Sequence, residues 1–502
     1  PPAPTSAAAA DAKTEATQEG SPAADETPAA PAAPALATAA AANPPAASAP
    51  KAPGRRAPAA VAVRSAEEKK AVYQALKPVL TRSEALEQAE GVAEIKALSP
   101  TAARVIALTG SADASLDAIA KAIRNDHAIA LKIIRVANST AFTRGEPVST
   151  LNDAVLRIGV QQIRQTVINL EIMENFSSDA SDYIDHRLFW EHSIGVAACC
   201  SLIAREMRLM DPDEAFTVGL LHDVGRMILN QAFGPLYTDA LRFARENQFP
   251  LDQIERRMFL IDHASIMNNV LHNWGVHKDL IQPIVNHHLS VGNIRQTCPK
   301  HIESVAMVAL ANRIAHSIRI GCSGDETVYA SEEYFEATKL PAGFLNMAHD
   351  KLPEMVFDMR LAMLGEMGMN GFPEPKRICE HMGVRPMYIT GDPARDCIQY
   401  WVNSIGGPEE SEAKPNLAVV RMRKQREDVG LEDQLRKAEA EYGLEPLPLI
   451  VLSESGKLVL PDSSRVNRES RLLCIPFTLE EFERTVVSLP GFGEPAAQLQ
   501  AA

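Results

Sequence analysis

The middle of the chain has the spacing of apolar residues that is typical of amphipathic helices. One set follows Ser115, which is placed to cap a helix start, and consists of Leu116, Ile119, Ala120 and Ile123. A second set follows Asp126, another capping residue, and consists of Ala130, Ile133, Ile134 and Ala137. A third set consists of Val196, Cys199, Cys200, Ile203 and Met207. The pattern predicts an all-helical domain over residues 71–370, since this stretch lacks segments of alternating β-branched residues.

The pattern changes after about residue 385. Short apolar runs appear at 386–389 ("PMYI"), 417–420 ("LAVV"), 448–452 ("PLIVL") and 471–475 ("RLLCI"), separated by helical or loop segments. A parallel sheet with crossover helices requires this alternation. We therefore expect a separate, small α/β domain over residues 385–495.

Residues 1–70 have a third kind of composition, in which Ala and Pro dominate. Prolines that recur every few residues remove backbone donors and clash with each helical turn, and few large apolar side chains are present to be buried. The composition predicts a disordered tether without a specific recognition role.

The overall composition excludes several protein classes. The net charge of −14 is spread along the 502 residues, which argues against a nucleic-acid-binding face. The seven cysteines are scattered without a CxxC pair, so neither a disulfide framework nor a thiolate zinc site is indicated. No apolar run approaches the roughly 20 residues of a membrane helix. We expect a cytoplasmic protein that binds neither membranes nor nucleic acid.

Histidine and carboxylate side chains stand out within the apolar helices. The pair His222-Asp223 lies in "LLHDVGRM", and an unpaired Asp223 would be costly to bury there. Other candidates are His192 in "FWEHSIGVAACC", His263 in "IDHASIM", and His287 and His288 in "IVNHHLS". Imidazole and carboxylate together suit a borderline or hard divalent cation, and such a cation can activate water against phosphorus.

The segments "HSIGVA", "GLLHDVGR" and "VNHH" resemble the HD superfamily of metal-dependent phosphohydrolases. The resemblance implies one metal held by His192, His222 and Asp223. It implies a second metal near three further histidines, which are His263, His287 and His288. In an enzyme of this kind the catalytic residues would be Asp223 and Arg226, and the cofactor would be Mn, Fe or Mg.

Two positions depart from the pattern of this superfamily. The distal Asp falls at Asn312 in "VAMVALANRIAHSI", and the Lys that follows His-Asp-x-Gly is Arg226. A neutral amide lacks the charge that a hard cation needs, and Asp223 alone offsets little of the repulsion between two metals. We therefore expect no cofactor and no catalytic residue. The cleft around His192, His222, Asp223, Arg226 and Asn312 is then a binding site.

The segments upstream of the His-Asp pair resemble the first half of the HDOD domain, an HD-related output domain of bacterial signalling proteins. The matching phrases are a helix start at Asp126-His127, "VANSTAF" at 136–142 and the turn Ile158-Gly159. The resemblance covers about residues 90–320. It implies regulation rather than turnover.

The C-terminal segment resembles the last part of a response-regulator receiver domain. Ser453 fits the Ser or Thr that ends one receiver strand, and Ile475-Pro476-Phe477 keeps the Pro and Phe of a later motif without its Lys. The strand that should end in the phosphorylated Asp offers Arg421 and Met422, and only Asp392 stands where an acidic pair is expected. Such a domain cannot run phosphoryl transfer. The resemblance implies a pseudo-receiver, used as an interaction or dimerisation surface, and an unrelated small α/β domain is the alternative.

The sequence thus predicts a mainly helical bacterial signal-transduction protein. We expect its HDOD domain to act without catalysis, by binding a signalling protein or a nucleotide. The alternative is a metal-dependent phosphohydrolase or phosphodiesterase of the HD superfamily, which would use the same cleft. A structural scaffold with a closed cleft is a third possibility.

Overall fold

The computed structural model describes residues 66–95, 99–109, 115–124, 126–139, 145–176, 184–274, 276–364, 383–405, 414–423, 430–454 and 468–492. These residues all belong to one of the two compact units of the chain, Ala62–Ala502. The first helix, Ala66–Ala75, begins inside the range that the sequence assigned to the tether. The remainder of that tether, residues 1–65, lies outside the described residues.

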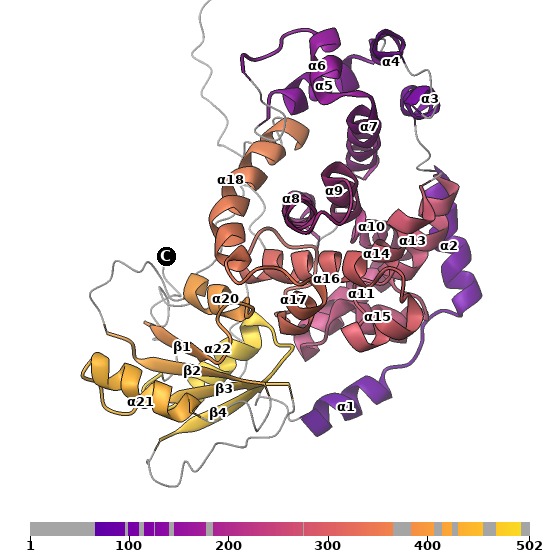
Figure 1. The fold of residues 1–502 in the computed structure, drawn as a ribbon. Helices are drawn as coiled ribbons and strands as arrows, with labels where there is room; N and C mark the ends of the chain where they lie inside the picture. The colour runs from indigo at the N-terminus through magenta and orange to yellow at the C-terminus, as the bar shows by residue number, and fades with distance from the viewer. Residues whose placement is uncertain are drawn as a thin grey trace, which may run out of the picture. The chain divides into compact units, whose positions relative to one another are not determined.

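The described residues between 66 and 364 are mainly helical, as predicted (Figure 1). Its first helices are α1 (Ala66–Ala75), α2 (Arg82–Ile95), α3 (Pro100–Thr109), α4 (Leu116–Ile123), α5 (His127–Ala137), α6 (Leu151–Ile158) and α7 (Val160–Asn175). The next are α8 (His186–Met207), α9 (Pro212–Leu221), α10 (Val224–Phe233), α11 (Pro235–Asn247), α12 (Leu251–Phe259) and α13 (His263–Asn273). The last are α14 (Lys278–Val285), α15 (Val291–Thr297), α16 (Ile302–Ser317), α17 (Glu332–Thr338) and α18 (Phe344–Leu364).

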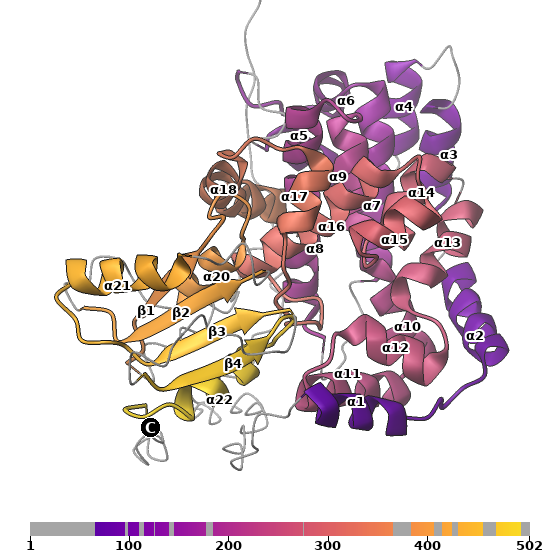
Figure 2. The same cartoon turned by 60° about the horizontal axis from the view of Figure 1, so that its bottom comes forward.

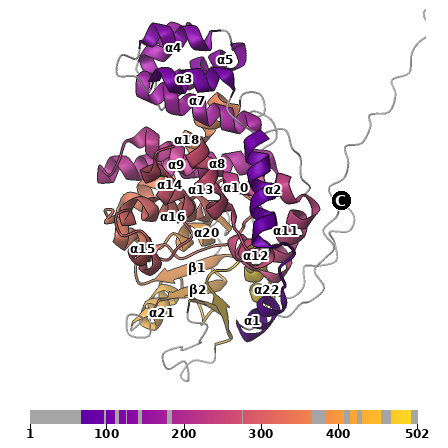
Figure 3. The ribbon, with the colours of Figure 1, turned by 90° about the vertical axis from the view of Figure 1, so that its right-hand side faces the viewer.

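The short helices near the start of this region begin where the sequence places their caps. The Ser115 side chain accepts a hydrogen bond from the backbone N–H of Ala118 at the start of α4. Asp126 does the same for Ile129 at the start of α5. Each cap satisfies one of the backbone donors that the first turn leaves unpaired. In Figure 3 the resulting helices α3, α4, α5 and α7 gather at one end of the helical part.

Helix α8 runs through the centre of the helical core. Of the periodic set predicted on it, Val196, Cys199, Cys200 and Ile203 are fully buried, and Met207 is half-buried at the end of the helix. Buried residues occur all around this helix rather than along one stripe, as expected of a helix enclosed by others. Helix α8 packs against α9, α16 and α18. It therefore contacts helices from several parts of the sequence.

A four-stranded parallel sheet follows in the C-terminal part (Figure 2). Its strands lie in the order β1 (Pro386–Thr390), β2 (Leu417–Met422), β3 (Leu449–Ser453) and β4 (Ser470–Cys474), within one or two residues of the four predicted runs. The helices around it are α20 (Ile398–Ile405), α21 (Leu431–Glu441) and α22 (Leu479–Val487). Mainly helical structure with a small parallel sheet is therefore the fold class of the described chain.

The two faces of the sheet are covered by different helices. Leu417 and Val419 of β2 belong to an apolar cluster with α20 and α22, whereas Ala418 and Val420 belong to a cluster with α21. This division follows from the period of two along a strand. Because both faces are buried, the strands appear in the sequence as continuous apolar runs.

None of the described helices has the length and apolar character needed to cross a bilayer.

Candidate functional site

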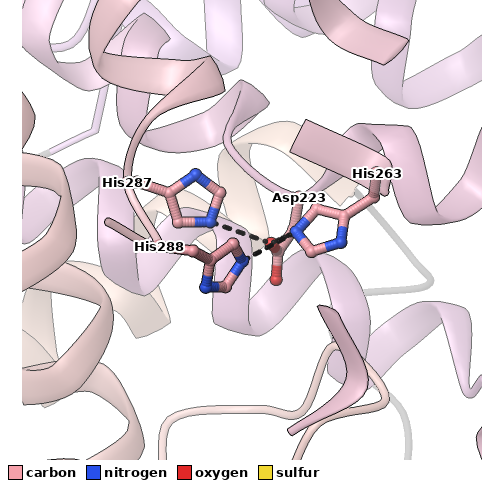
Figure 4. A group of neighbouring side chains, drawn as sticks. All are labelled: Asp223, His263, His287 and His288. Carbon is pink, nitrogen blue, oxygen red and sulfur yellow. Dashed lines mark hydrogen bonds and ion pairs between the residues drawn. The ribbon is translucent and has the colours of Figure 1, made fainter. Parts of the chain in front are cut away.

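The candidate site is built around Asp223, at the junction of two helices. Helix α9 ends at Leu221, and α10 begins at Val224, so His222 and Asp223 occupy the turn between them. Asp223 stands at the cap position of α10, yet its carboxylate accepts no capping hydrogen bond. The carboxylate instead faces imidazole rings from other helices (Figure 4). A residue type that normally caps a helix therefore serves a different purpose here.

The histidines that meet Asp223 come from distant parts of the chain. His263 is the first residue of α13, and His287 and His288 directly follow α14. His192 lies on α8. We call the set His192, His222, Asp223, His263, His287 and His288 the histidine-aspartate cluster. Its six members are those that the sequence proposed as metal ligands, and the fold brings them together.

The two oxygens of Asp223 have different neighbours. Oδ1 lies 3.1 Å from Nε2 of His263 and 3.6 Å from Nε2 of His287. Oδ2 lies 3.3 Å from Nε2 of His222 and 3.0 Å from Nη1 of Arg226. Neither oxygen accepts a hydrogen bond from a described residue. Nitrogen atoms thus converge on the carboxylate without good hydrogen-bonding geometry.

Three of the histidines are oriented by backbone carbonyls. Nδ1 of His222 donates to the oxygen of Gly219 at 2.7 Å, and Nδ1 of His287 donates to that of Ile284 at 2.6 Å. Nδ1 of His192 donates to the oxygen of Ile320 at 3.2 Å. A carbonyl can only accept, so the ring proton lies on Nδ1. The Nε2 atom of each of these three rings points into the cluster and is buried without a hydrogen bond from the described residues.

His263 is held by a carboxylate instead. Its Nδ1 donates to Oε2 of Glu255 at 2.6 Å, and its backbone N–H donates to the same oxygen at 3.0 Å. The hydroxyl of Tyr237 donates to Oε1 of Glu255 at 2.6 Å. Burial lowers the pKa of His263, but the carboxylates of Glu255 and Asp223 outweigh it and raise the pKa to about 9. His263 is therefore the charged imidazole of the cluster at neutral pH.

The other rings of the cluster that show a shift are favoured as neutral imidazoles. Burial lowers the pKa of His192 to about 3 and that of His287 to about 4. Burial also lowers the pKa of His288 well below its usual value, with further contributions from His287 and His263. Burial raises the pKa of Asp223, but Arg226 and His222 outweigh it and hold this pKa well below its ordinary value. The site thus combines an ionised carboxylate and the charged ring of His263 with the neutral rings of His192, His287 and His288.

Arg226 is a fully buried cation beside this carboxylate. Its Nη1 donates to Oγ of Ser323 at 2.5 Å and to the carbonyl oxygen of Ser323 at 3.2 Å. Its Nη2 lies 3.9 Å from Oδ2 of Asp325. Burial lowers the pKa of Arg226, but Asp223 and Asp325 outweigh this effect and raise it. The guanidinium is therefore a fixed positive charge on the Oδ2 side of Asp223.

The donor atoms form two overlapping groups, which share Asp223. In one group, Asp223, His263, His287 and His288 each place a ligand atom within 4.8 Å of the others. In the other, His192, His222 and Asp223 do so. Three imidazole nitrogens and one carboxylate oxygen fit a divalent ion such as zinc, iron or manganese. The first group fits such an ion once His263 gives up its Nε2 proton, whereas the second shares its carboxylate oxygen with Arg226.

Asn312 lies near this region but is not joined to the cluster. It is buried on α16, and among the described residues no hydrogen bond or ion pair connects it to Asp223 or to the histidines. The ring that α16 brings closer is His316, one turn after Asn312, whose centroid lies 4.7 Å from that of His192. Burial lowers the pKa of His316. The spacing of four residues from Asn312 in a helix is the signal that could have indicated this ring.

Other residues of the site were not predicted. Glu255 and Tyr237 lie on α12 and α11, and Ser323 and Asp325 lie in the segment after α16. Glu255 occurs in a helix with two arginines, "QIERR", where a carboxylate ordinarily faces solvent. No sequence signal separates it from its exposed neighbours. Only the packing of α12 against the start of α13 gives it a role.

Gly225 allows the helix that carries Asp223 to approach His263. A Cβ atom at this position would meet the carbonyl oxygen and carbonyl carbon of His263. We expect Gly225→Ala to force the two helices apart and to lower the free energy of unfolding by about 1–3 kcal/mol. Urea denaturation would measure this change. Gly292→Ala is the control, because a Cβ there would contact only the Ser290 hydroxyl at 3.9 Å. Equal stability of the two variants would contradict the close approach.

Comparisons with known proteins find a family match in the helical part of the chain. Residues 95–290 match the family model of the HDOD domain. No match to a curated protein is found. Among solved structures, an HDOD domain protein with unknown function from Geobacter sulfurreducens is 22% identical, covers 56% of this chain and 97% of its own, and has a TM-score of 0.47.

Two other solved structures have similar scores. A candidate phosphohydrolase from Shewanella amazonensis SB2B is 22% identical, with coverage of 57% and 97% and a TM-score of 0.44. A candidate signal transduction protein from Marinobacter aquaeolei VT8 is 19% identical, with coverage of 59% and 69% and a TM-score of 0.45. Because all three TM-scores lie below 0.5, the assignment rests on the family model. The helical part of this chain carries an HDOD domain, matched over residues 95–290.

Proposed function

We propose that the chain is a signal-transduction protein of the bacterial cytoplasm whose HDOD domain acts by binding a signalling protein or a nucleotide, without turnover. The observation that carries this proposal is the position of Arg226. Its guanidinium lies 3.0 Å from Oδ2 of Asp223 and is held there by Ser323. A divalent cation on that oxygen would meet a fixed positive charge in a buried environment. The pair of metals that the HD resemblance implies is therefore disfavoured.

The burial of the cluster also supports a role without turnover. The side chains of His192, His222, Asp223, His263 and His287 are fully buried. Only His288 among the cluster is half-buried. A substrate phosphate would have to reach Asp223 through packed side chains, whereas enzyme active sites are ordinarily concave and open to ligand.

A metal-dependent phosphohydrolase is the second candidate. It is favoured by Nε2 of His287, which lies 3.6 Å from Oδ1 of Asp223, and by Nε2 of His288, which lies 2.9 Å from Nε2 of His263, both on the side away from Arg226. A divalent ion held by Asp223, His263, His287 and His288 would polarise a phosphoryl oxygen as a Lewis acid. Glu255 would then orient His263 through its Nδ1, as carboxylates commonly do for metal-bound histidines.

A combined metal and activity measurement separates the two candidates. The chain is purified, stripped with chelator, and incubated with Mn²⁺ or Fe²⁺ before elemental analysis. Hydrolysis of bis(4-nitrophenyl) phosphate and of cyclic and linear nucleotides is followed in the same samples. We expect no hydrolysis above the level of the Asp223→Asn variant, because Arg226 disfavours a second ion on Oδ2 of Asp223 and the side chain of Asp223 is fully buried. Hydrolysis that Asp223→Asn abolishes would overturn the proposal in favour of the phosphohydrolase.

For the C-terminal domain we propose a pseudo-receiver that serves as an interaction or dimerisation surface. The flavodoxin-like order of receivers is 2-1-3-4-5. Without the edge strand numbered 2, that arrangement reads 1-3-4-5. The order β1-β2-β3-β4 of the described strands corresponds to this shortened arrangement. Arg421, at the position expected for the phosphoacceptor, is buried, with its Nη2 2.5 Å from Oε1 of Glu454 and 3.3 Å from Oε1 of Glu332. A paired arginine at that position supports a domain without phosphoryl transfer.

A further inference from the structure

The helical part contains a cavity that is separate from the histidine-aspartate cluster. It has a volume of about 280 Å³ and is lined by residues of α5, α7, α8, α9 and α18. None of its lining residues belongs to the cluster. Helix α18 packs against α5 and α8 (Figures 1 and 3) and contributes part of the lining. This volume is near the lower end of the range for small-molecule sites.

One wall of the cavity is a row of methionines. Met355, Met359 and Met363 are spaced four residues apart on α18, so they lie along the same side of the helix. Met359 and Met363 are buried, and Met355 is half-buried. Phe216 of α9 and Leu202 of α8 complete the apolar lining. Thioether side chains adapt to the shape of an apolar body, as they do at other binding surfaces.

A buried polar group in the lining has an unused acceptor. Asn169 of α7 is 4% exposed, and its Nδ2 donates to Oγ1 of Thr217 at 3.3 Å. Its Oδ1 accepts no hydrogen bond from any residue in the described part of the chain. An unsatisfied buried acceptor is costly, ordinarily by about 1–3 kcal/mol. This oxygen is shielded in the structure, and a ligand that brings an N–H or O–H group to it would remove that cost once the amide turns toward the cavity.

The rim of the cavity carries an excess of positive charge. Arg205 and Lys351 are both exposed lining residues. The carboxyl of Asp213 interacts with Arg205 and with the Gln162 side chain, which offsets one of the two cations. No ion pair between Lys351 and a described residue is found. In a chain with a net charge of −14, this rim therefore favours an anionic group on a ligand.

We propose that this cavity binds a small organic anion with an apolar body and a hydrogen-bond donor. The apolar body lies against the methionines of α18, the donor reaches Oδ1 of Asn169, and the anionic group lies beside Lys351. Since α18 lies beyond the matched span 95–290, the site is completed by a helix that the family model does not cover. The proposal does not depend on whether the Asp223 site is catalytic.

The probe for this site is 8-anilinonaphthalene-1-sulfonate, which combines an aromatic body, an N–H group and a sulfonate. Fluorescence titration of the full chain should show one bound probe per chain, with a rise in melting temperature, because the probe binds the folded form. Lys351→Gln should weaken binding about two- to fivefold, the range expected of one exposed charge. Lys278→Gln, at an exposed lysine of α14, should leave it unchanged. N-phenyl-1-naphthylamine, which lacks the sulfonate, should bind both variants equally.

Two substitutions in the lining of the cavity test the apolar body and the hydrogen-bond donor of the proposed ligand. Met359→Trp should abolish binding by filling the cavity. Asn169→Leu should weaken binding, because it removes the acceptor for the donor of the ligand; it also removes the bond to Thr217, so probe affinity and not the melting temperature of the free protein is the readout. A merely structural asparagine would leave probe affinity unchanged. If Met359→Trp does not fold, the Asn169 and Lys351 variants still test whether the probe binds in this cavity. Probe binding that none of these three substitutions changes, or that lowers the melting temperature, would overturn the proposal.

Discussion

Replacing Asp223 with alanine is expected to lower the free energy of unfolding by about 3–5 kcal/mol, the cost of leaving a buried charge without its partner. The stranded charge is the guanidinium of Arg226, which is fully buried and keeps only Ser323 and the more distant Asp325. His263 also loses the carboxylate beside its Nε2. Urea denaturation with chelator present measures the effect on the metal-free protein.

Two further variants test whether the cost comes from the stranded charge. Asp223→Ala combined with Arg226→Met removes both partners, and we expect this double variant to be more stable than Asp223→Ala alone. Asp239→Ala removes an exposed carboxylate that pairs with Arg242 on α11, and its effect should stay below about 1 kcal/mol. A double variant whose cost equals the sum of the two single costs would show that Asp223 and Arg226 do not depend on each other.

Replacing Glu255 with alanine is expected to have an effect of similar size, about 3–5 kcal/mol, because Glu255 is the buried partner of three donors. These donors are Nδ1 of His263, the backbone N–H of His263 and the Tyr237 hydroxyl. All three would remain buried without an acceptor. Thermal and urea unfolding measure the loss of stability.

The matched control for this prediction is Tyr237→Phe. It removes a single hydroxyl from the same network and leaves both bonds between Glu255 and His263 in place, so its cost should be about 0.5–1.5 kcal/mol. If Glu255→Ala costs no more than Tyr237→Phe, the bonds to His263 contribute little to stability. The description of Glu255 as the residue that fixes His263 would then be wrong.

Much of the fold could be predicted from local patterns. The caps Ser115 and Asp126 begin helices where expected, because a side chain that satisfies backbone donors acts on its own first turn. The four strands were also placed within one or two residues, since both faces of a parallel sheet are apolar. The start of α1 was missed, because "AEEKKAVYQA" has few large apolar residues and resembles the charged parts of the preceding segment.

The candidate site was predictable only in part. The six members of the histidine-aspartate cluster stand out because imidazole and carboxylate groups are unusual in apolar helices. Glu255 and Tyr237 act through contacts across helices, and a single sequence gives no information on such contacts. The position of Arg226 beside Oδ2 of Asp223 is likewise a tertiary property. That Asn312 stands in place of a metal-binding carboxylate stays a prediction.

The histidine-aspartate cluster also has a consequence for biosynthesis. Its residues enter the growing chain in the order His192, His222 and Asp223, then His263, and finally His287 and His288. Contacts between residues far apart in sequence form late in folding. Asp223 and Arg226 therefore leave the ribosome long before the surrounding helices can enclose them, and they stay hydrated until α13 and α14 have been synthesised. A nascent chain that stops before His287 would expose this polar centre to chaperones and proteases, so the cluster would distinguish complete HDOD domains from truncated ones.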